Sequence, residues 1–485
     1  MMRKTIEETL YLHALAHPEK DAILTINDRI SFHDLFYTAL AHAAFLQENG
    51  LKEKDVVVLR ASNDIEYALL YLSIHLAHGI VCSLERTTPA MTLCDVADQM
   101  SAVFVLADDV SSEGHVWKIL PRKVDRENKA EREVPPFAPL EDPADILFTT
   151  GTTGASKGVL LSQKALVATA ENLIFGCGYE EDMLLVAPGP LNHANAIRKL
   201  FTSLINGNTI FLLNGMTNVR AFFQVLDLPY THIACCLPPA MIRFILTVSK
   251  KKISEYQDKI LFIESASAPL PEPDRLLLGE YLPKTRLIIN YGSSEAASVT
   301  MYDCIAHPGL VNCIGKPMPN AEILVVDDNK VPIQSSQENV GLIACKGDVN
   351  MIEYVKSPEL TAEVLIDGIV YTNDIGYIDE NGFVYTIGRK GDVINVGGLK
   401  VAPTEVEEAA LAFDGIDECI CIAVPDRISG LAPKLLYVGE AELNVQVLTR
   451  FLAERLEAYK VPRSFEKVDE IRKTFNGKID RKSYR

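Results

Sequence analysis

Positive charge is scarce in this sequence, because 47 Lys and Arg residues face 65 Asp and Glu residues and leave a formal net charge of −18. An acidic surface argues against a nucleic-acid partner and against a polybasic membrane contact. Long apolar runs are also missing, since none approaches the roughly 18 to 20 residues of a membrane span. We therefore predict a protein that binds no nucleic acid and does not cross a membrane.

A secretion signal and a metal-site cysteine pattern are missing too. Residues 1–20 have no signal-peptide core or cleavage site, and their pattern predicts an amphipathic helix. The ten cysteines lack the spacing of metal ligands: Cys235 and Cys236 are adjacent, and Cys419 and Cys421 lie in the strand-like segment ECICIAV. We expect reduced, buried cysteines in a cytoplasmic protein.

The length of 485 residues is too great for one ordinary domain. Strand and helix patterns alternate along most of the chain, which favours parallel α/β layers, and residues 321–385 have the short strands and close turns of a β-rich subdomain. A compact α+β pattern follows Lys390-Gly391. We predict an α/β protein with a large N-terminal domain of layered α/β subdomains (1–389) and a small, mobile α+β C-terminal domain (390–485).

Glycine, threonine and one lysine gather in residues 145–162, DILFTTGTTGASKGVLLS. Apolar segments at 146–148 and 159–161 predict two strands around this loop. Glycines allow close backbone approach, hydroxyls donate hydrogen bonds, and Lys157 brings positive charge, so the loop suits a polyphosphate. It is not a Walker loop, which requires GK followed by Ser or Thr. A surface turn rich in small residues is the alternative.

FTTGTTGASKG resembles the phosphate-binding loop of the adenylate-forming superfamily, usually written [YF]TSGTTGxPKG, with Thr150 in place of Ser and Ser156 in place of Pro. This superfamily includes acyl- and aryl-CoA synthetases, adenylation domains of peptide synthetases and firefly luciferase. The resemblance implies that the loop binds ATP. The loop residues that it assigns to ATP are Thr149, Thr150, Gly151, Thr152, Thr153, Gly154 and Lys157.

The segment NYGSSEAA at 290–297 follows a predicted strand, and ligands collect at strand ends in α/β layers. A carboxylate such as Glu295 near a triphosphate suits Mg²⁺, although Glu in the first turn of a helix explains it equally well. The segment resembles the family pattern YGxTE, which implies that Tyr291 stacks on adenine, Ser294 lies by the α-phosphate and Glu295 holds Mg²⁺. Neighbours assigned to ATP in the same way are Asn290, Gly292 and Ser293, and Ala266, Ser267 and Ala268 of ESASAPLPEP.

The segment VYTNDIGYIDENGF contains Asp374, which by itself is an ordinary turn former in a loop between strands. It resembles the family pattern YxTGDxG, with Asn373 in place of Gly, and this implies that Asp374 holds both ribose hydroxyls. Arg389 in IGRKGD matches an arginine that contacts ribose and phosphate, and Ile387 falls in the same ATP-binding segment.

The C-terminal domain begins at a hinge in this resemblance. Gly391 stands where relatives have Asp or Lys, and glycine accommodates the rotation at little steric cost. The loop Gly397, Gly398, Leu399 would border a pantetheine tunnel. NGKIDR resembles the terminal motif PRTxxGKIDR, which implies that Lys478 enters the active site and bridges the acyl carboxylate and the α-phosphate. Without the resemblance, this lysine would be a solvated tail residue.

The segment PLNH at 190–193 resembles the PLxH of acyl- and aryl-CoA synthetases, whose histidine gates the acyl pocket. His193 could equally be a satisfied loop histidine. Arg198, about one helical turn further along, is either a surface helix residue or the partner of a second carboxylate of a diacid. Peptide-synthetase domains have a substrate-binding Asp in this region, and none is evident here.

These segments predict an ATP-dependent, AMP-forming ligase for a small carboxylic acid, with ATP, Mg²⁺ and CoA as its cofactors. No Ser/His/Asp or Cys/His pattern is present, and none is needed, because the acid itself attacks ATP. A phosphopantetheine arm on an acyl carrier protein is the alternative acceptor. Two other classes stay open: a phosphotransferase, which leaves Lys478 unexplained, and an inactive nucleotide-binding protein. A homo-oligomer is also compatible with the sequence.

Overall fold

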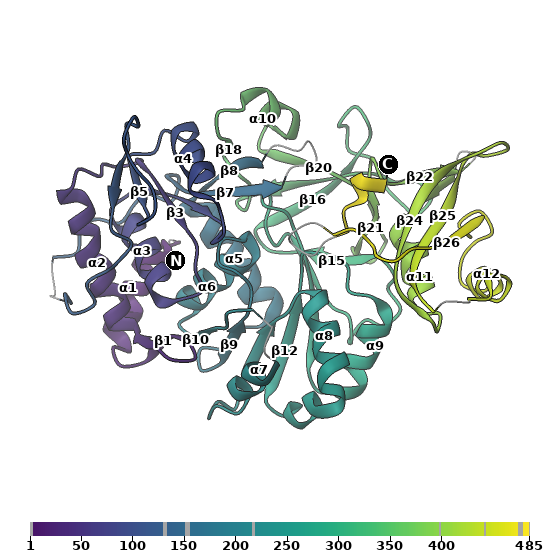
Figure 1. Cartoon of the computed structure of the whole chain (residues 1–485), viewed down its shortest axis with the longest axis horizontal. Coiled ribbons are helices and arrows are strands. Elements are labelled where there is room, and N and C mark those ends of the chain that lie inside the picture. Colours follow the sequence, from purple (N-terminus) through teal and green to yellow (C-terminus); the bar gives the residue numbers. More distant parts are fainter. Residues whose placement is uncertain are drawn as a thin grey trace.

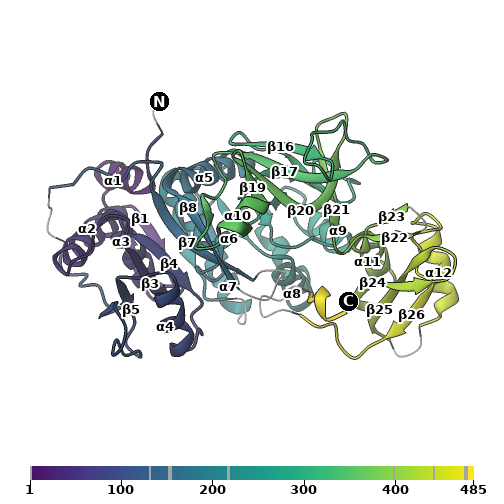
Figure 2. The same cartoon turned by 90° about the horizontal axis from the view of Figure 1, so that it is seen from above.

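The computed structural model describes residues 3–129, 133–150, 156–215, 219–396, 399–440, 443–473 and 479–484. A large α/β body occupies one side of the molecule, and a smaller unit built on β22 to β26 lies at the other end (Figures 1 and 2). This arrangement confirms the predicted fold class.

One sheet carries the predicted phosphate loop at its edge, where two antiparallel strands extend a parallel set. Its strands in spatial order are β18 (Glu353–Tyr354), β8 (Ser156–Ser162), β7 (Pro143–Thr150), β4 (Ile80–Leu84), β3 (Val56–Arg60), β5 (Phe104–Leu106) and β6 (Lys118–Leu120).

A second, larger sheet joins a parallel half to an antiparallel, β-rich half at β13 and β14. The strands from β2 to β13 in spatial order are β2 (Arg29–Ser31), β1 (Asp21–Leu24), β10 (Thr209–Leu212), β9 (Leu184–Ala187), β11 (Ile233–Cys236), β12 (Ile260–Ser265) and β13 (Arg286–Tyr291). The β-rich half continues with β14 (Thr300–Asp303), β15 (Cys313–Pro317), β21 (Val384–Arg389), β20 (Ile369–Ile378), β17 (Gly341–Gly347) and β16 (Ala321–Val326), with β19 (Leu365–Ile366) paired to β20.

Helices connect and cover these sheets. They are α1 (Ile6–Ala16), α2 (Phe32–Glu48), α3 (Ile65–Leu76), α4 (Ala90–Gln99), α5 (Gln163–Cys177), α6 (Ala194–Asn206), α7 (Val219–Leu226), α8 (Pro239–Ser249), α9 (Glu272–Tyr281), α10 (Pro358–Val364) and the 3₁₀ helix η1 (Lys250–Tyr256). Side chains at the start of α1, α2, α3 and α5 accept hydrogen bonds from free amides of the first turn. Because α5 and α6 pack into an apolar core that includes strands of both sheets, they join the two layers.

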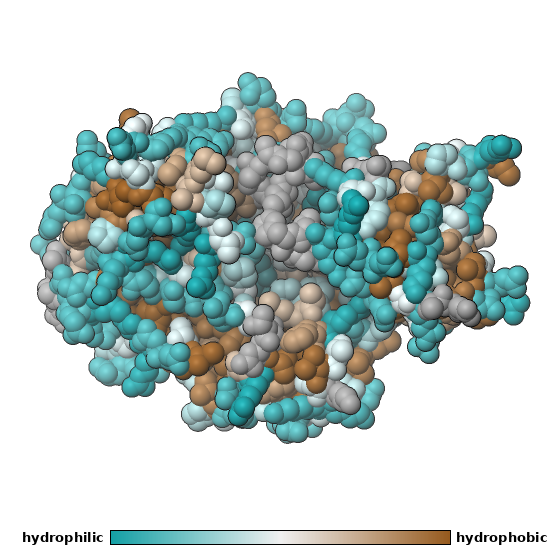
Figure 3. Space-filling view, in the orientation of Figure 1, coloured by the Kyte–Doolittle hydropathy of each residue, from teal (hydrophilic) through white to brown (hydrophobic). Residues whose placement is uncertain are grey.

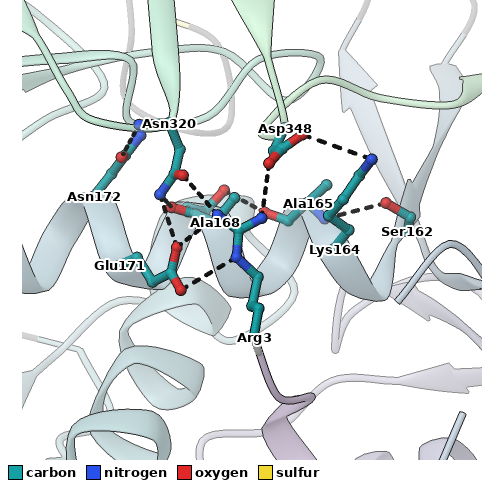
Figure 4. A network of polar contacts seen from close by, with 10 residues as sticks. Arg3, Ser162, Lys164, Ala165, Ala168, Glu171, Asn172, Asn320 and Asp348 are labelled. Atoms are coloured by element: carbon teal, nitrogen blue, oxygen red, sulfur yellow. Dashed lines mark hydrogen bonds and ion pairs between the residues drawn. The ribbon is translucent and has the colours of Figure 1, made fainter. Parts of the chain in front are cut away.

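A polar network around Arg3 ties the start of the chain to α5 and to the β-rich half (Figure 4). The Arg3 guanidinium lies 2.9 Å from Glu171 and 2.8 Å from Asp348, and it donates to the amide oxygen of Asn320 at 2.7 Å. Lys164 of α5 also lies 3.6 Å from Asp348. Segments more than 300 residues apart in sequence are thereby held together.

The small unit has its own sheet and its own apolar core, which contains Val406, Leu435 and Leu448. Its elements are β22 (Ile394–Val396), β23 (Leu399–Val401), α11 (Pro403–Leu411), β24 (Ile416–Asp426), β25 (Gly430–Gly439), α12 (Val445–Ala453), β26 (Ser464–Lys467) and the 3₁₀ helix η2 (Arg481–Tyr484). A separate core is the mark of an independent domain. We propose that the domain boundary lies at Lys390-Gly391, directly after β21.

One ion pair and one hydrogen bond hold the small unit against α8 and α9 of the large body. Arg275 of α9 pairs with Glu408 of α11, and the two side chains are only 15% and 16% exposed. Arg243 of α8 donates to the carbonyl oxygen of Asp417 at 3.3 Å and pairs with Asp274 at 3.1 Å. Burial raises the pKa of Glu408 and the Arg275 guanidinium opposes this shift, so the pair is partly desolvated.

Most of one face of the molecule is hydrophilic and most cysteines are buried, as the sequence predicts (Figure 3). On the face shown in Figure 3, hydrophilic groups cover most of the surface and hydrophobic groups form separate patches. All ten cysteines lie within the described residues as free thiols, and only Cys94 among them is not buried. Among the described residues, no helix is both long and apolar enough to cross a bilayer.

A buried imidazole joins α1, α3 and β7. The ring of His75 donates through Nδ1 to Glu7 at 2.8 Å and through Nε2 to Asp145 at 3.0 Å, and all three side chains are almost fully buried. Burial lowers the pKa of His75, but the hydrogen bonds to Asp145 and Glu7 outweigh this and raise the pKa to about 10. The imidazolium therefore persists at neutral pH between the two carboxylates.

This contact predicts a pH-dependent stability. A pKa raised from 6.5 to about 10 stabilises the fold fully below pH 6.5, and the contribution is lost as pH rises toward about 10. His75→Gln is expected to lower stability at neutral pH by about 3 kcal/mol, the scale of a broken buried ion pair, and to flatten the pH dependence in this window. Thermal unfolding midpoints measured across these pH values test both effects.

His115→Gln is the matched control, because His115 pairs with Asp98 at 2.8 Å in a more exposed position. It is expected to keep the wild-type slope. An unchanged slope in His75→Gln would contradict the assignment of the pH dependence to His75.

Candidate active site

Three residues predicted for ATP binding meet at the junction of β13, β20 and β21. The hydroxyl of Tyr291 donates to Asp374 Oδ2 at 2.5 Å, and Arg389 Nε lies 3.5 Å from Asp374 Oδ1. Asp374 and Arg389 are direct partners in the antiparallel register of β20 and β21. Asp374 thus lies within a strand, and the alternative of a turn former in a loop is wrong.

Burial, together with the Asp374 carboxylate, raises the pKa of Tyr291 well above its usual value. The hydroxyl therefore stays protonated and serves as a donor. In this structure the Asp374 carboxylate has a donor on one oxygen and a guanidinium near the other. A carboxylate oriented in this way can accept hydrogen bonds from vicinal hydroxyls such as those of a ribose.

Glu295 lies in the loop that follows β13, and the backbone there is tightly constrained. A side chain at Gly292 would place its Cβ 2.4 Å from the Ser298 amide nitrogen, so only glycine fits. Ser293 Oγ accepts from the amides of Glu295 and Ala296, both at 3.1 Å. No helix follows in this described segment, so the alternative of a helix N-terminus for Glu295 is wrong.

Tyr354 is a site residue that sequence reasoning missed. Its hydroxyl donates to Glu295 Oε1 at 2.6 Å, and Lys157 Nζ lies 5.4 Å from the centre of its ring, a cation–π contact. The short strand β18 brings it there by pairing Tyr354 with Val159 of β8. Tyr354 belongs to no motif recognised in the sequence, and only this strand pairing places it at the site.

The predicted phosphate loop has the flanking strands that the sequence indicates. β7 and β8 pair antiparallel, with Thr149 opposite Lys157 and Thr150 opposite Ser156. Lys157 is therefore held at the end of a hairpin, beside Tyr354. Outside the described residues lie Gly151, Thr152, Thr153 and Gly154, along with the side chains of Thr149 and Thr150.

The segment 266–268 leaves β12 next to the end of β13, since Ser265 and Ile289 are register partners in these parallel strands. Ser267 has φ of 77°, a left-handed conformation that is uncommon for a residue other than glycine. Ala266 is buried, whereas Ser267 and Ala268 are exposed. A ligand at these strand ends would contact this turn.

Asn290 is buried, and its side-chain amide donates to groups inside the protein. Its amide nitrogen donates to Glu264 Oε1 at 2.7 Å and to Ser298 Oγ at 3.2 Å, and Lys199 pairs with the same Glu264 oxygen at 2.9 Å. The side chain of Asn290 therefore supports the strand ends from the interior, and its contact with ATP stays a prediction.

His193 and Arg198 stand at the start of α6. His193 is the half-buried N-cap residue, and its side chain does not cap the helix. Arg198 is only 7% exposed, so the prediction of a surface position is wrong. Its guanidinium donates to the carbonyl oxygens of Ser293 at 3.2 Å and Ser294 at 3.3 Å, directly before Glu295.

The predicted hinge and tail lie in the small unit. Gly391 is in a turn after β21, where the Lys390 amide donates to Asn373 and the Asp392 amide donates to Arg389. Ile387 is half-buried in β21, and Leu399 is 51% exposed at the start of β23. Gly397, Gly398 and Lys478 lie outside the described residues.

The residues on either side of Lys478 are anchored. Lys473 and Ile479 form an antiparallel bridge, and the Asp480 amide donates to the Arg472 carbonyl at 2.9 Å. Arg481 makes two hydrogen bonds, at 2.8 and 2.5 Å, to the buried carboxylate of Glu407 on α11. This paired contact fixes the tail to the small unit.

Tyr291, at the carboxyl end of β13, lies with Asp374 and Arg389 of the antiparallel strands β20 and β21, and the carboxyl ends of parallel strands are where ligands bind in α/β sheets. The sequence matches the AMP-binding enzyme family over residues 10–355 and the AMP-binding enzyme C-terminal domain over residues 405–478. The chain belongs to this family, which confirms the resemblance to adenylate-forming enzymes.

Relatives and solved structures match along nearly the whole chain. A long-chain-fatty-acid–CoA ligase of Bacillus subtilis is 28% identical over 99% of this chain and 94% of its own length. A 2-succinylbenzoate–CoA ligase of Bacillus licheniformis is 27% identical over 96% of both. The o-succinylbenzoate CoA synthetase of Bacillus subtilis, solved with an acyl-adenylate intermediate, has a TM-score of 0.84 at 22% identity, covering 100% of this chain and 99% of that one.

The contacts of Asp374 generate a binding prediction. Asp374→Asn removes a charged acceptor, and we expect it to weaken AMP binding by about tenfold or more, since hydrogen bonds to charged groups contribute about 1.5 to 3 kcal/mol each. Isothermal titration calorimetry with AMP measures the change. Asp258→Asn, at an exposed ion pair with Lys284, is the control and is expected to bind as the wild type does. Equal affinity in both variants would remove Asp374 from the nucleotide site.

Proposed function

We propose that this chain is an ATP-dependent, AMP-forming acid–thiol ligase that joins a small carboxylic acid to CoA through an acyl-adenylate. The observation that carries this proposal is the convergence of Asp374, Tyr291 and Arg389 beside a loop that presents Glu295. The named relatives, which are both CoA ligases, support the same reaction class.

In the first half-reaction, the negative charge of the triphosphate has to be neutralised while the acid attacks. Asp374 orients the ribose, and Lys157 faces the phosphates with its ammonium group over Tyr354. The Glu295 carboxylate is a hard oxygen ligand on a fixed loop, so it fits Mg²⁺, an ion that also accompanies ATP in a structure of the Bacillus subtilis synthetase. Such an ion supplies charge neutralisation when it is bound. The acid's carboxylate oxygen attacks the α-phosphorus, and pyrophosphate leaves.

The second half-reaction needs a thiol at the same carbonyl. The sulfur of CoA attacks the acyl carbon of the adenylate, and AMP leaves as the C–O bond to phosphate breaks. We propose that the small domain turns about Gly391 between the two steps, removing Lys478 and bringing the segment at Leu399 to the site. Loss of the Arg275–Glu408 contact accompanies that turn, since the pair joins the two units.

His193 takes part in this proposal as the residue at the mouth of the acyl pocket. It is the N-cap residue of α6, and Arg198 of this helix contacts the loop that carries Glu295. The acid and the nucleotide would therefore bind next to each other, between the start of α6 and the loop after β13. This placement supports in-line attack without a protein nucleophile.

Acid-dependent ATP–pyrophosphate exchange tests the proposed function. A panel of monocarboxylic, dicarboxylic and aromatic acids is assayed with ATP and Mg²⁺, and CoA is then added to the acids that support exchange. We expect exchange with at least one acid, and AMP with an acyl-CoA once CoA is present. Accumulation of ADP without exchange would instead indicate a phosphotransferase. Nucleotide binding with neither product would indicate an inactive binding protein.

Lys478→Ala is expected to separate the half-reactions. Loss of a cation at the developing charge typically costs about 10² to 10³ in rate, so exchange is expected to fall by that factor. Thioester formation from a supplied acyl-adenylate is expected to stay within about twofold of wild type. Lys482→Ala, an exposed lysine of the same tail, is the control. Equal loss of both half-reactions would argue against the role of Lys478 in adenylation.

A further inference from the structure

Helix α6 carries two buried cations in succession with different kinds of partner. Lys199 pairs with the Glu264 carboxylate at 2.9 Å. Arg198 has no carboxylate within ion-pair distance among the described residues, and its guanidinium donates to two backbone carbonyls. Burying a guanidinium costs free energy because the charge loses its hydration. A buried arginine whose partners are backbone carbonyls and not a carboxylate therefore needs an explanation.

The two carbonyls belong to consecutive residues, Ser293 and Ser294, and Glu295 comes next. The same loop is held from other sides: the Met351 amide donates to the Glu295 carbonyl at 2.8 Å, and Tyr354 donates to its carboxylate at 2.6 Å. Arg198 supplies a further contact to this loop from α6. Its planar fork matches two neighbouring acceptors in a way that a lysine ammonium cannot.

We propose that Arg198 is a positioning residue, whose guanidinium fixes the loop at Ser293 and Ser294 so that Glu295 is presented to Mg²⁺ and the Ser294 hydroxyl to the α-phosphate. The inference deepens the proposed function and rests on nucleotide binding at this loop. It also joins α6, whose N-cap residue is His193, to the proposed Mg²⁺ side of the site. Helix α6 would then support both the acid-binding side and the nucleotide-binding side of the site.

The rival role for Arg198 is to bind a second carboxylate of the substrate. The charges around it favour the positioning role. Burial lowers the pKa of Arg198 to about 10, and the carboxylates of Glu295 and Asp145 oppose that shift. Its guanidinium already donates to the carbonyl oxygens of Ser293 and Ser294, so these donors hold the loop and are not left over for a substrate anion.

Binding of ATP by the full-length chain, with Mg²⁺ and with EDTA, tests the proposal by calorimetry. Arg198→Met is expected to lose about tenfold or more of the Mg²⁺-dependent gain in ATP affinity, the scale of a support removed from a metal ligand. Its affinity for ATP in EDTA is expected to stay within about twofold. Glu295→Gln removes the proposed Mg²⁺ ligand, so it defines the complete loss of the Mg²⁺-dependent gain in ATP affinity. The double variant Arg198→Met with Glu295→Gln is expected to lose no more of this gain than Glu295→Gln alone.

Arg286→Met is the matched control. Arg286 also donates to two consecutive carbonyls, those of Gly176 and Cys177, but at the opposite end of β13. It is expected to keep the wild-type Mg²⁺ effect. Arg198→Lys keeps the charge but not the fork; it serves as the measured variant if Arg198→Met unfolds, and about a tenfold loss is expected there too.

Retention of the Mg²⁺ effect in Arg198→Met or Arg198→Lys, or additive losses in the double variant, would overturn the proposal. Pyrophosphate exchange with propionate and succinate separates the rival: a loss confined to succinate would assign Arg198 to a second carboxylate. If the wild-type chain itself shows no Mg²⁺-dependent ATP binding, the proposed function fails. If Glu295→Gln abolishes that binding and Arg198→Met does not, only this inference fails.

Discussion

A carboxylate that meets phosphate charge has to be fixed by the protein before the nucleotide arrives, because reorganisation during the reaction would consume the electrostatic gain. The loop after β13 meets this constraint through contacts from several directions. Ser293 satisfies its amides, Met351 and Tyr354 hold Glu295, and Arg198 takes the carbonyls. The glycine at 292 lets the backbone turn closely enough for these contacts to form. The site therefore depends on a rigid loop more than on any single side chain.

The same principle extends into the interior of the large body. His75 holds Asp145 at the start of β7, and β7 leads through the hairpin to Lys157. The neighbouring layer has the Lys199–Glu264 pair beneath the ends of β12 and β13. Each ion pair is buried and has hydrogen bonds on both partners, the condition under which buried charge specifies one arrangement. The hairpin that carries Lys157 and the ends of β12 and β13 thus rest on separate buried ion pairs.

Much of this organisation could be predicted from residue patterns. Alternating apolar segments located the strands β7, β8 and β13, and motif resemblance singled out Asp374, Tyr291 and Arg389, which the structure brings together. Arg198 was misplaced because a charged helix residue normally faces solvent, whereas α6 is covered by both sheets. Tyr354 escaped notice because its position depends on the pairing of a two-residue strand, a long-range contact without a local signal. The role of Lys478 stays a prediction.

The Arg275–Glu408 ion pair has a consequence for the proposed turn of the small unit. Both partners are mostly shielded from water, so opening it requires hydration of two ions before any compensating contact forms. In the proposed turn about Gly391, this hydration would add to the barrier for separating the two units. Mobile salt ions screen shielded partners weakly, so the lifetime of this contact is expected to change little with ionic strength.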